Sequence, residues 1–194
     1  MVVVEWGFYN LITALGLNAM IGKGGLVRKV AFRRETLVYA QSLFSFVQFS
    51  IEISLLTIIV SIAGSRAWAW VPVTFILMVL LMVFATGIGL AMSAFVVYFR
   101  DLTYLWTIIT HVYSFVTPII YDQAQLKGRV SNFGYTLLEW NPMAMFVRGF
   151  RHTLYDGGGI PPLHLAYLAA ISALSLGLGL LVFGRLNRRI AEEI

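Results

Sequence analysis

The sequence predicts an all-α integral membrane protein with four complete transmembrane helices and, before them, a partial one. Of the 194 residues, 59 % are hydrophobic and 12 % are charged, and the mean hydropathy is +0.83, which excludes a soluble globular domain. Apolar runs recur along the chain, and each is long enough to cross a hydrocarbon core of roughly 30 Å. Basic residues gather beside these runs, as they do at one face of a membrane.

The four complete spans are predicted at 36–63, 70–95, 102–121 and 163–183, within a single membrane domain that covers 1–194. Residues 1–22 are apolar but contain Glu5 and two asparagines. This stretch fits the second part of a span, and the alternative is a helix lying in the headgroup region.

The region 122–162 is predicted to lie on the outer side of the membrane. It contains two apolar pieces, 133–140 and 143–150, separated by Asn141-Pro142. Pieces of this length are too short to cross a bilayer, so they fit two re-entrant helices before the last span.

The distribution of Lys and Arg predicts the orientation. Residues 23–35 hold five of the fourteen basic residues, Arg100 lies in a short turn, and the tail 184–194 holds three more, which makes nine on one side. The loops 64–69 and 122–162 hold the other five. Because basic residues favour the cytoplasmic side, we expect a multi-pass membrane protein with a cytoplasmic C-terminus.

Two of the predicted spans carry polar residues along one helical face. In the first complete span the polar residues fall at spacings of 4, 3 and 4: Gln41, Ser45, Gln48 and Glu52. In the third, the spacings are 4, 3, 4 and 3, with an aromatic and an imidazole side chain beside them: Thr103, Thr107, Thr110, Ser114 and Thr117, with His111 and Tyr113. Polar groups at membrane depth face protein or water, so both stripes are predicted to line one pathway.

Each of these polar groups also has a structural alternative. Glu52 could hold helices together through a hydrogen bond, and the hydroxyl groups could bond to carbonyls of their own helix. His111 could be a hydrogen-bonded structural residue.

Small residues predict two helix–helix seams. One lies near the end of the second complete span, at Gly87, Ala91 and Ala94. The other runs along the last span, at Ala166, Ala170, Ala173 and Gly177.

The sequence lacks the common signatures of a catalytic site. It has no cysteine, no Walker-type phosphate-binding loop, no HExxH and no Gly-x-Ser-x-Gly. Its three histidines lie at 111, 152 and 164, without metal-ligand spacing. We therefore expect a non-catalytic chain that holds no metal or cofactor.

Four short motifs lie between the predicted spans in a fixed order: 26–35, then Phe99-Arg100-Asp101-Leu102 with Tyr104, then Pro118-Ile119-Ile120-Tyr121, then Asn141-Pro142. Together they resemble the membrane subunits of type-2 ABC exporters, the permeases that export polysaccharides, O-antigens and teichoic acids. The resemblance covers the chain from about Trp6 to the tail.

The resemblance implies two copies of this permease in the cytoplasmic (inner) membrane of a bacterium, paired with two copies of a cytosolic ABC ATPase, which binds the ATP and Mg. Residues 20–34 are then the coupling helix, with contacts from Leu26, Arg28, Lys29, Phe32, Arg33 and Arg34, and the second contact comes from Arg100 and Asp101. A channel at the dimer interface would pass a lipid-linked glycan. The hinge into the re-entrant gate helices would be formed by Pro118, Tyr121, Asn141 and Pro142.

The resemblance also implies two departures from the family. Members usually have an amphipathic helix, a first span and the start of the second before the position of Val2, so the N-terminal part is expected to be missing here. A proline is usual where Arg33 stands, and proline there would end the coupling helix.

Three alternative functions stay open at this point. An exporter of the same family could carry a drug or another small amphiphile. A polyprenyl-phosphate-dependent membrane enzyme, or a scaffold or secondary transporter in which Glu52 and His111 couple protons, would belong to other classes.

Overall fold

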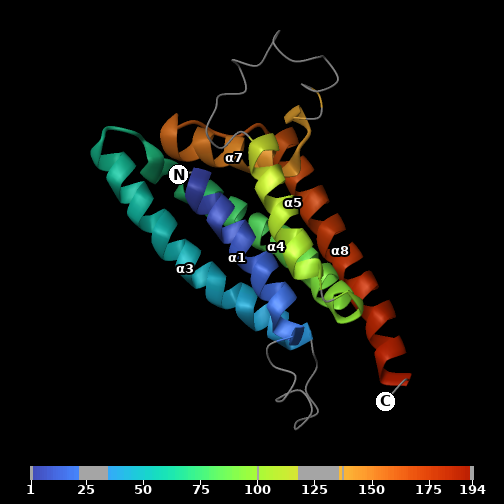
Figure 1. Cartoon of the computed structure of the whole chain (residues 1–194). Coiled ribbons are helices and arrows are strands. Elements are labelled where there is room, and N and C mark those ends of the chain that lie inside the picture. Colours follow the sequence, from blue (N-terminus) through green and yellow to red (C-terminus); the bar gives the residue numbers. More distant parts are fainter. Residues whose placement is uncertain (1, 22–34, 100, 118–135, 137, 193–194) are drawn as a thin grey trace.

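The computed structural model describes residues 2–21, 35–99, 101–117, 136 and 138–192, and the structural statements below concern these residues. Four long helices form a bundle: α1 (Val2–Ile21), α3 (Glu35–Ile62), α4 (Val71–Tyr98) and α8 (Pro162–Glu192). The shorter α5 (Leu102–Val116) stands beside them, and α7 (Pro142–Phe150) lies across one end of the bundle (Figure 1). No strand occurs in the described part of the chain, in agreement with the predicted fold class.

Prolines mark where several of these helices begin. Pro72 and Pro142 lie at the first positions of α4 and α7, and α8 begins at Pro162. The first turn of a helix leaves its N–H groups without intrahelical partners, so the missing donor of proline costs nothing there. A 3₁₀ turn, η1 (Ala67–Trp70), leads into α4, and a π-helical turn, η3 (Arg151–Tyr155), continues α7.

Three helices are long and apolar enough to cross a membrane: Glu35–Ile62, Ala67–Tyr98 and Pro162–Leu186. They agree with the first, second and last complete spans predicted from the sequence. The third predicted span, 102–121, is only partly described, because α5 has 15 residues and 118–121 lie outside the described part. Fifteen residues reach about 22 Å, which is short of the hydrocarbon core, so a fourth complete span is not confirmed.

The chain is organised around α4, which packs against α1, α3 and α8. Leu77, Leu81 and Ala85 of α4 are fully buried, and they join Phe8 of α1 and Phe49 of α3 in one hydrophobic core. The rings of Phe8 and Phe49 stack with centroids 4.2 Å apart, which ties α1 to α3. The N-terminal helix therefore packs along α3 and α4, which favours part of a span over a helix lying in the headgroup region.

The structure supports the predicted small-residue seam on α4. Gly87 is buried where α4 meets α8, and a Cβ there would collide with the backbone of Ser175. Ala94 is buried between Val38 of α3 and Phe183 of α8 in a second hydrophobic cluster. A side chain larger than hydrogen at position 87 would force the two helices apart.

The second predicted seam is wrong in this chain. The four small residues named for α8 are all exposed: Ala166, Ala170, Ala173 and Gly177. The face of α8 that packs on α4 contains Leu168, Ser172, Ser175 and Gly179 instead. Ser172 and Ser175 donate hydrogen bonds to the carbonyl oxygens of Leu80 and Phe84, at 2.9 and 2.8 Å. Small side chains occur on both faces of α8, so side-chain size alone does not indicate which face packs on α4.

The ends of the helices divide between the two ends of the bundle as the predicted orientation requires. The end of α1, the start of α3, the turn between α4 and α5, and the end of α8 share one end, and η1 and α7 lie at the other (Figure 1). At the α7 end, Trp70 donates from Nε1 to the carbonyl of Gly157 at 2.8 Å, and Ser65 donates to Leu154 at 3.0 Å. These bonds fasten the α3–α4 connection to the segment after α7.

Candidate functional site

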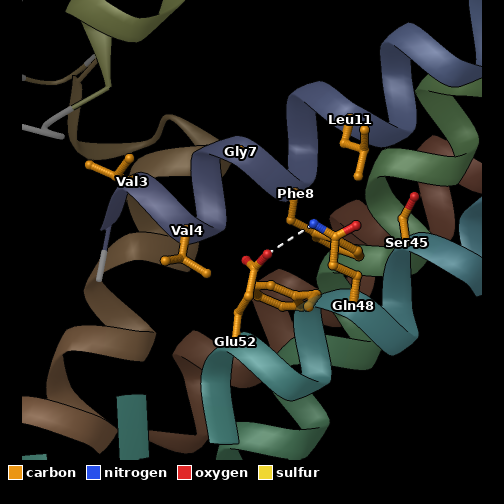
Figure 2. A pocket seen from close by; sticks show the side chains of 9 residues that line it. Val3, Val4, Gly7, Phe8, Leu11, Ser45, Gln48 and Glu52 are labelled. Carbon is orange, nitrogen blue, oxygen red and sulfur yellow. Dashed lines mark hydrogen bonds between the residues drawn. The ribbon is translucent and has the colours of Figure 1, made fainter. Parts of the chain in front are cut away.

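A hollow of about 470 Å³ lies between α1 and α3 and brings three residues of the first predicted stripe together: Ser45, Gln48 and Glu52. The opposite wall is apolar and comes from α1, including Val4, Gly7 and Leu11. Figure 2 shows the side chains of Gln48 and Glu52 extending from α3 toward α1. The fourth residue of this stripe, Gln41, does not line the hollow.

The polar groups of this hollow are satisfied only in part. Gln48 donates from Nε2 to Oε1 of Glu52 at 3.0 Å, within the same helix. The hydroxyl of Ser45 is buried and has no hydrogen-bond partner in the described part of the chain. In the described part of the chain Glu52 is hydrogen-bonded within its own helix, so there its carboxylate does not join two helices, as the structural alternative requires.

A second hollow, of about 370 Å³, lies between α1 and α5 and contains part of the hydroxyl stripe. Thr107, His111 and Ser114 line it from α5, together with Thr110. The sequence prediction did not include four further lining residues: Trp6, Asn10, Ala14 and Trp106. Their spacing would have indicated the same surfaces, since Trp6 and Asn10 are one turn apart on α1 and Trp106 is next to Thr107.

Most hydroxyls of α5 bond to their own helix. Thr107 donates to the carbonyl of Thr103 at 3.0 Å, Thr110 to that of Trp106 at 2.9 Å, and Ser114 to that of His111 at 2.6 Å. This is the back-bonding alternative considered for the stripe. Each hydroxyl oxygen still has lone pairs that can accept a hydrogen bond from a guest in the hollow.

His111 has a defined hydrogen bond within α5. Its Nδ1 lies 3.0 Å from the carbonyl oxygen of Thr107, and a carbonyl can only accept, so Nδ1 carries the hydrogen. The side chain is exposed, which leaves Nε2 available at the surface. Thr117, in contrast, is fully buried and lines neither of these hollows.

The two polar stripes therefore border separate hollows, one on each flank of α1. Two different sets of α1 residues line the two hollows. The first hollow is lined by Val3, Val4, Gly7, Phe8 and Leu11, and the second by Trp6, Asn10 and Ala14. In the single chain α1 stands between the stripes, and the common pathway predicted from the sequence is not formed by one copy.

Asn141, one of the predicted hinge residues, holds the start of α7. Its Oδ1 accepts from the backbone N–H of Met143 at 3.0 Å, which caps the helix. The same oxygen accepts from the phenol of Tyr113 on α5 at 2.5 Å. Pro142 follows as the first residue of α7. Tyr113, predicted to line a channel, thus connects α5 to the helix that crosses the end of the bundle.

The ring of Tyr113 is itself fixed by two aromatic neighbours on α1. Its centroid lies 5.5 Å from that of Trp6 and 6.2 Å from that of Tyr9. These contacts give the phenol a defined position, so α1, α5 and α7 are joined at this point.

Most of the predicted coupling and hinge residues lie outside the described part of the chain: Leu26, Arg28, Lys29, Phe32, Arg33, Arg34, Arg100, Pro118 and Tyr121. Asp101 is described and exposed, directly before α5 at the end of the bundle that also holds the end of α8. No group of three or more His, Asp or Glu side chains that could hold a metal ion occurs within the described ranges.

Comparisons with known proteins cover nearly the whole chain. A family model described as ABC-2 type transporter matches residues 1–155. Two proteins of Klebsiella pneumoniae named "O-antigen export system permease protein RfbA" are each 22 % identical over 191 residues, covering 96 % of this chain and 71 % of theirs. A protein of the same name from Myxococcus xanthus is 22 % identical over 192 residues, covering 98 % and 73 %.

Proposed function

Because this chain belongs to the ABC-2 type transporter family, we propose that it is the permease subunit of an ATP-driven exporter of a cell-envelope polysaccharide. One observation carries the proposal. The relatives named as O-antigen export permeases are similar to this chain along 96–98 % of its length, so the similarity is not confined to one motif. The three helices that are long and apolar enough to span a membrane agree with a membrane subunit.

In this proposal, the chain supplies the path and a separate ABC ATPase supplies the energy. The ATPase binds ATP and Mg, and its closure shifts the permease between states, so the permease itself is non-catalytic. The ATPase contacts the coupling segment 20–34 and the turn at Arg100-Asp101. Support comes from the bundle, in which the end of α1, the start of α3 and the α4–α5 turn lie together at one end.

We place that end of the bundle, with the C-terminal end of α8, on the cytoplasmic side of the bacterial inner membrane. The densest basic segment, 23–35, lies in the sequence between α1 and α3, whose adjoining ends are at this end of the bundle, so the positive-inside rule supports this orientation. The opposite end, with α7 lying across the bundle, then faces outward, where a gate for the exported glycan belongs.

The cargo path in this proposal is shared between two copies of the chain. In a single copy the polar stripes border hollows on opposite flanks of α1, and both hollows have polar groups set among apolar walls. Pairing two such surfaces would surround a lipid-linked glycan with hydroxyl, amide and aromatic groups, which suit the hydroxyl-rich and apolar faces of sugars.

The test is a deletion of this reading frame, followed by measurement of the polysaccharide at the cell surface and inside the cell. We expect the surface polysaccharide to disappear and the lipid-linked form to accumulate inside, with recovery when the wild-type chain is supplied. The control is a partner ATPase inactivated for hydrolysis, which should give the same phenotype.

Unchanged polysaccharide at the surface would contradict the proposal. If the deletion instead raised sensitivity to a drug or another amphiphile, the cargo would be that smaller molecule. Export of either cargo requires ATP hydrolysis. The two are distinguished by whether purified glycolipid raises the rate of ATP hydrolysis by the reconstituted complex of permease and ATPase.

A further inference from the structure

The hollow between α1 and α3 has polar groups whose hydrogen-bonding capacity is largely unused. Gln48 and Glu52 bond to each other, at 3.0 Å, through one amide hydrogen and one carboxylate oxygen. The carbonyl oxygen of Gln48 and the second carboxylate oxygen remain as acceptors. The hydroxyl of Ser45 is fully buried and has no partner in the described ranges. These three groups share one wall (Figure 2).

The depth of this hollow restricts what can occupy it. Helix α3 runs from Glu35 to Ile62, so Glu52 is 17 residues from one end and 10 from the other. At a rise of about 1.5 Å per residue, these separations are about 25 and 15 Å. A lipid headgroup stays at the surface of the hydrocarbon core, which is roughly 30 Å thick, and does not reach this level. Acyl chains reach this level but have no group that can donate a hydrogen bond to the polar wall, whereas a polar molecule in transit through the membrane can.

The chemistry of the wall selects among such molecules. A carboxylate and an amide oxygen accept hydrogen bonds, and a carboxylate repels an anion such as a phosphate. The hydroxyls of a sugar are donors, and neighbouring hydroxyls can reach both oxygens of a carboxylate. The facing wall is apolar, with Val4, Gly7 and Leu11, and Gly7 leaves open space because a Cβ there would meet nothing within 4 Å.

We propose that this hollow is a binding subsite for the neutral sugar residues of the cargo, in which Glu52 and Gln48 accept hydrogen bonds from sugar hydroxyls. This subsite rests on the proposed export of a glycan, and it excludes the phosphate end of a lipid-linked glycan. Ser45, which is buried in the wall of the hollow, supplies a further hydroxyl.

The test uses the absence of cysteine from the natural chain. Leu11→Cys places a single thiol in the hollow, and the permease is reconstituted into vesicles with its ATPase partner. The rate of modification by a water-soluble maleimide is measured alone, with maltohexaose, and with inorganic pyrophosphate. Val47→Cys is the matched control, because Val47 is 56 % exposed on the neighbouring helix α3 and does not line the hollow.

We expect the thiol of the Leu11→Cys variant to react faster than that of the Val47→Cys variant, because the hollow admits water and the outer face of α3 contacts lipid. Maltohexaose at about ten times its Kd should slow the reaction at position 11 about tenfold, and pyrophosphate should not slow it. Glu52→Leu should abolish this protection. If the Glu52→Leu variant fails to assemble with the ATPase, Gln48→Leu replaces it in the test. Gln48 is exposed, so this substitution should leave the fold intact and weaken protection in the same way.

Three results would overturn the subsite: a thiol at position 11 that reacts no faster than the control, protection by pyrophosphate instead of the oligosaccharide, or protection that persists in Glu52→Leu. The deletion and complementation experiment on surface polysaccharide tests the exporter function independently of the subsite. If the wild-type chain restores export while maltohexaose gives no protection, the subsite is wrong and the exporter function stands.

Discussion

The hydrogen bond between Tyr113 and Asn141 predicts that the double variant Tyr113→Phe/Asn141→Ala is no less stable than Asn141→Ala alone. Asn141 Oδ1 accepts from both the phenol of Tyr113 and the N–H of Met143, so it joins α5 to the first turn of α7. Tyr113→Phe removes one donor but leaves Oδ1 bonded to Met143. The cost is therefore that of one hydrogen bond, about 1 kcal/mol.

Asn141→Ala should lower the free energy of unfolding more, because it removes the hydrogen bonds from Tyr113 and Met143 and leaves the phenol of Tyr113 without its acceptor. Loss of the helix cap costs about 1 kcal/mol, and a part-buried phenol without its acceptor costs about 1 kcal/mol more. The total is about 2 kcal/mol. In the double variant no phenol is left unsatisfied, so the loss should fall to about 1–2 kcal/mol.

The assay is the midpoint of thermal unfolding of the purified permease, followed by the loss of folded protein on size-exclusion chromatography. For a domain of this size, 1 kcal/mol corresponds to about 2–4 °C. Tyr104→Phe is the control, since Tyr104 lies on the same helix, is 81 % exposed and should change nothing. A double variant whose loss equals the sum of the two single losses would refute the shared bond.

Three further predictions concern packing, coupling and the path. Gly179→Ala should destabilise the bundle, because its Cβ would meet the backbone of α4. The Cβ of Gly177→Ala meets nothing within 4 Å, so this variant should be neutral or more stable by about 0.5–1 kcal/mol. Equal midpoints of thermal unfolding for the two variants would contradict the packing of α8. Charge reversal of the coupling segment should weaken co-purification with the ATPase, and full recovery of the complex would count against the assignment; the positions to change are Arg28, Lys29 and Arg34. Thr107→Leu combined with Ser114→Leu should lower surface polysaccharide while assembly survives, and normal surface polysaccharide would remove these residues from the path.

The sequence predicted the helices well because their signals are local. The starts and ends of α3 and α4 differ by only a few residues from the predicted spans, and 143–150 corresponds to α7. Membrane helices require long apolar runs, and prolines such as Pro142 mark their starts. The third span was harder, because α5 ends at Val116 and the chain at Thr117 is extended.

Which faces of the helices meet was predicted less well. Gly87 was assigned correctly to a seam, but on α8 the exposed Ala166–Gly177 stripe was chosen over the face with Ser172 and Ser175. Both faces of α8 have small residues, and only the position of α4 decides which face is covered. Several residues of the two polar stripes line hollows, but Gln41 and Thr117 line neither of them, and the insertion of α1 between the stripes is a property of the packing.

Composition and the spacing of apolar, basic and polar residues thus determined that this is a helical membrane protein, where its three long apolar helices lie in the described part of the chain, and which side chains share a helix face. These properties depend on helix periodicity and on transfer from water, which neighbouring residues specify. Only the tertiary structure decided that Gln48 and Glu52 face α1, that Tyr113 reaches the cap of α7, and that α8 packs through its serines. Those contacts join residues far apart in the chain, and the choice among alternative faces depends on the shapes of all the helices together.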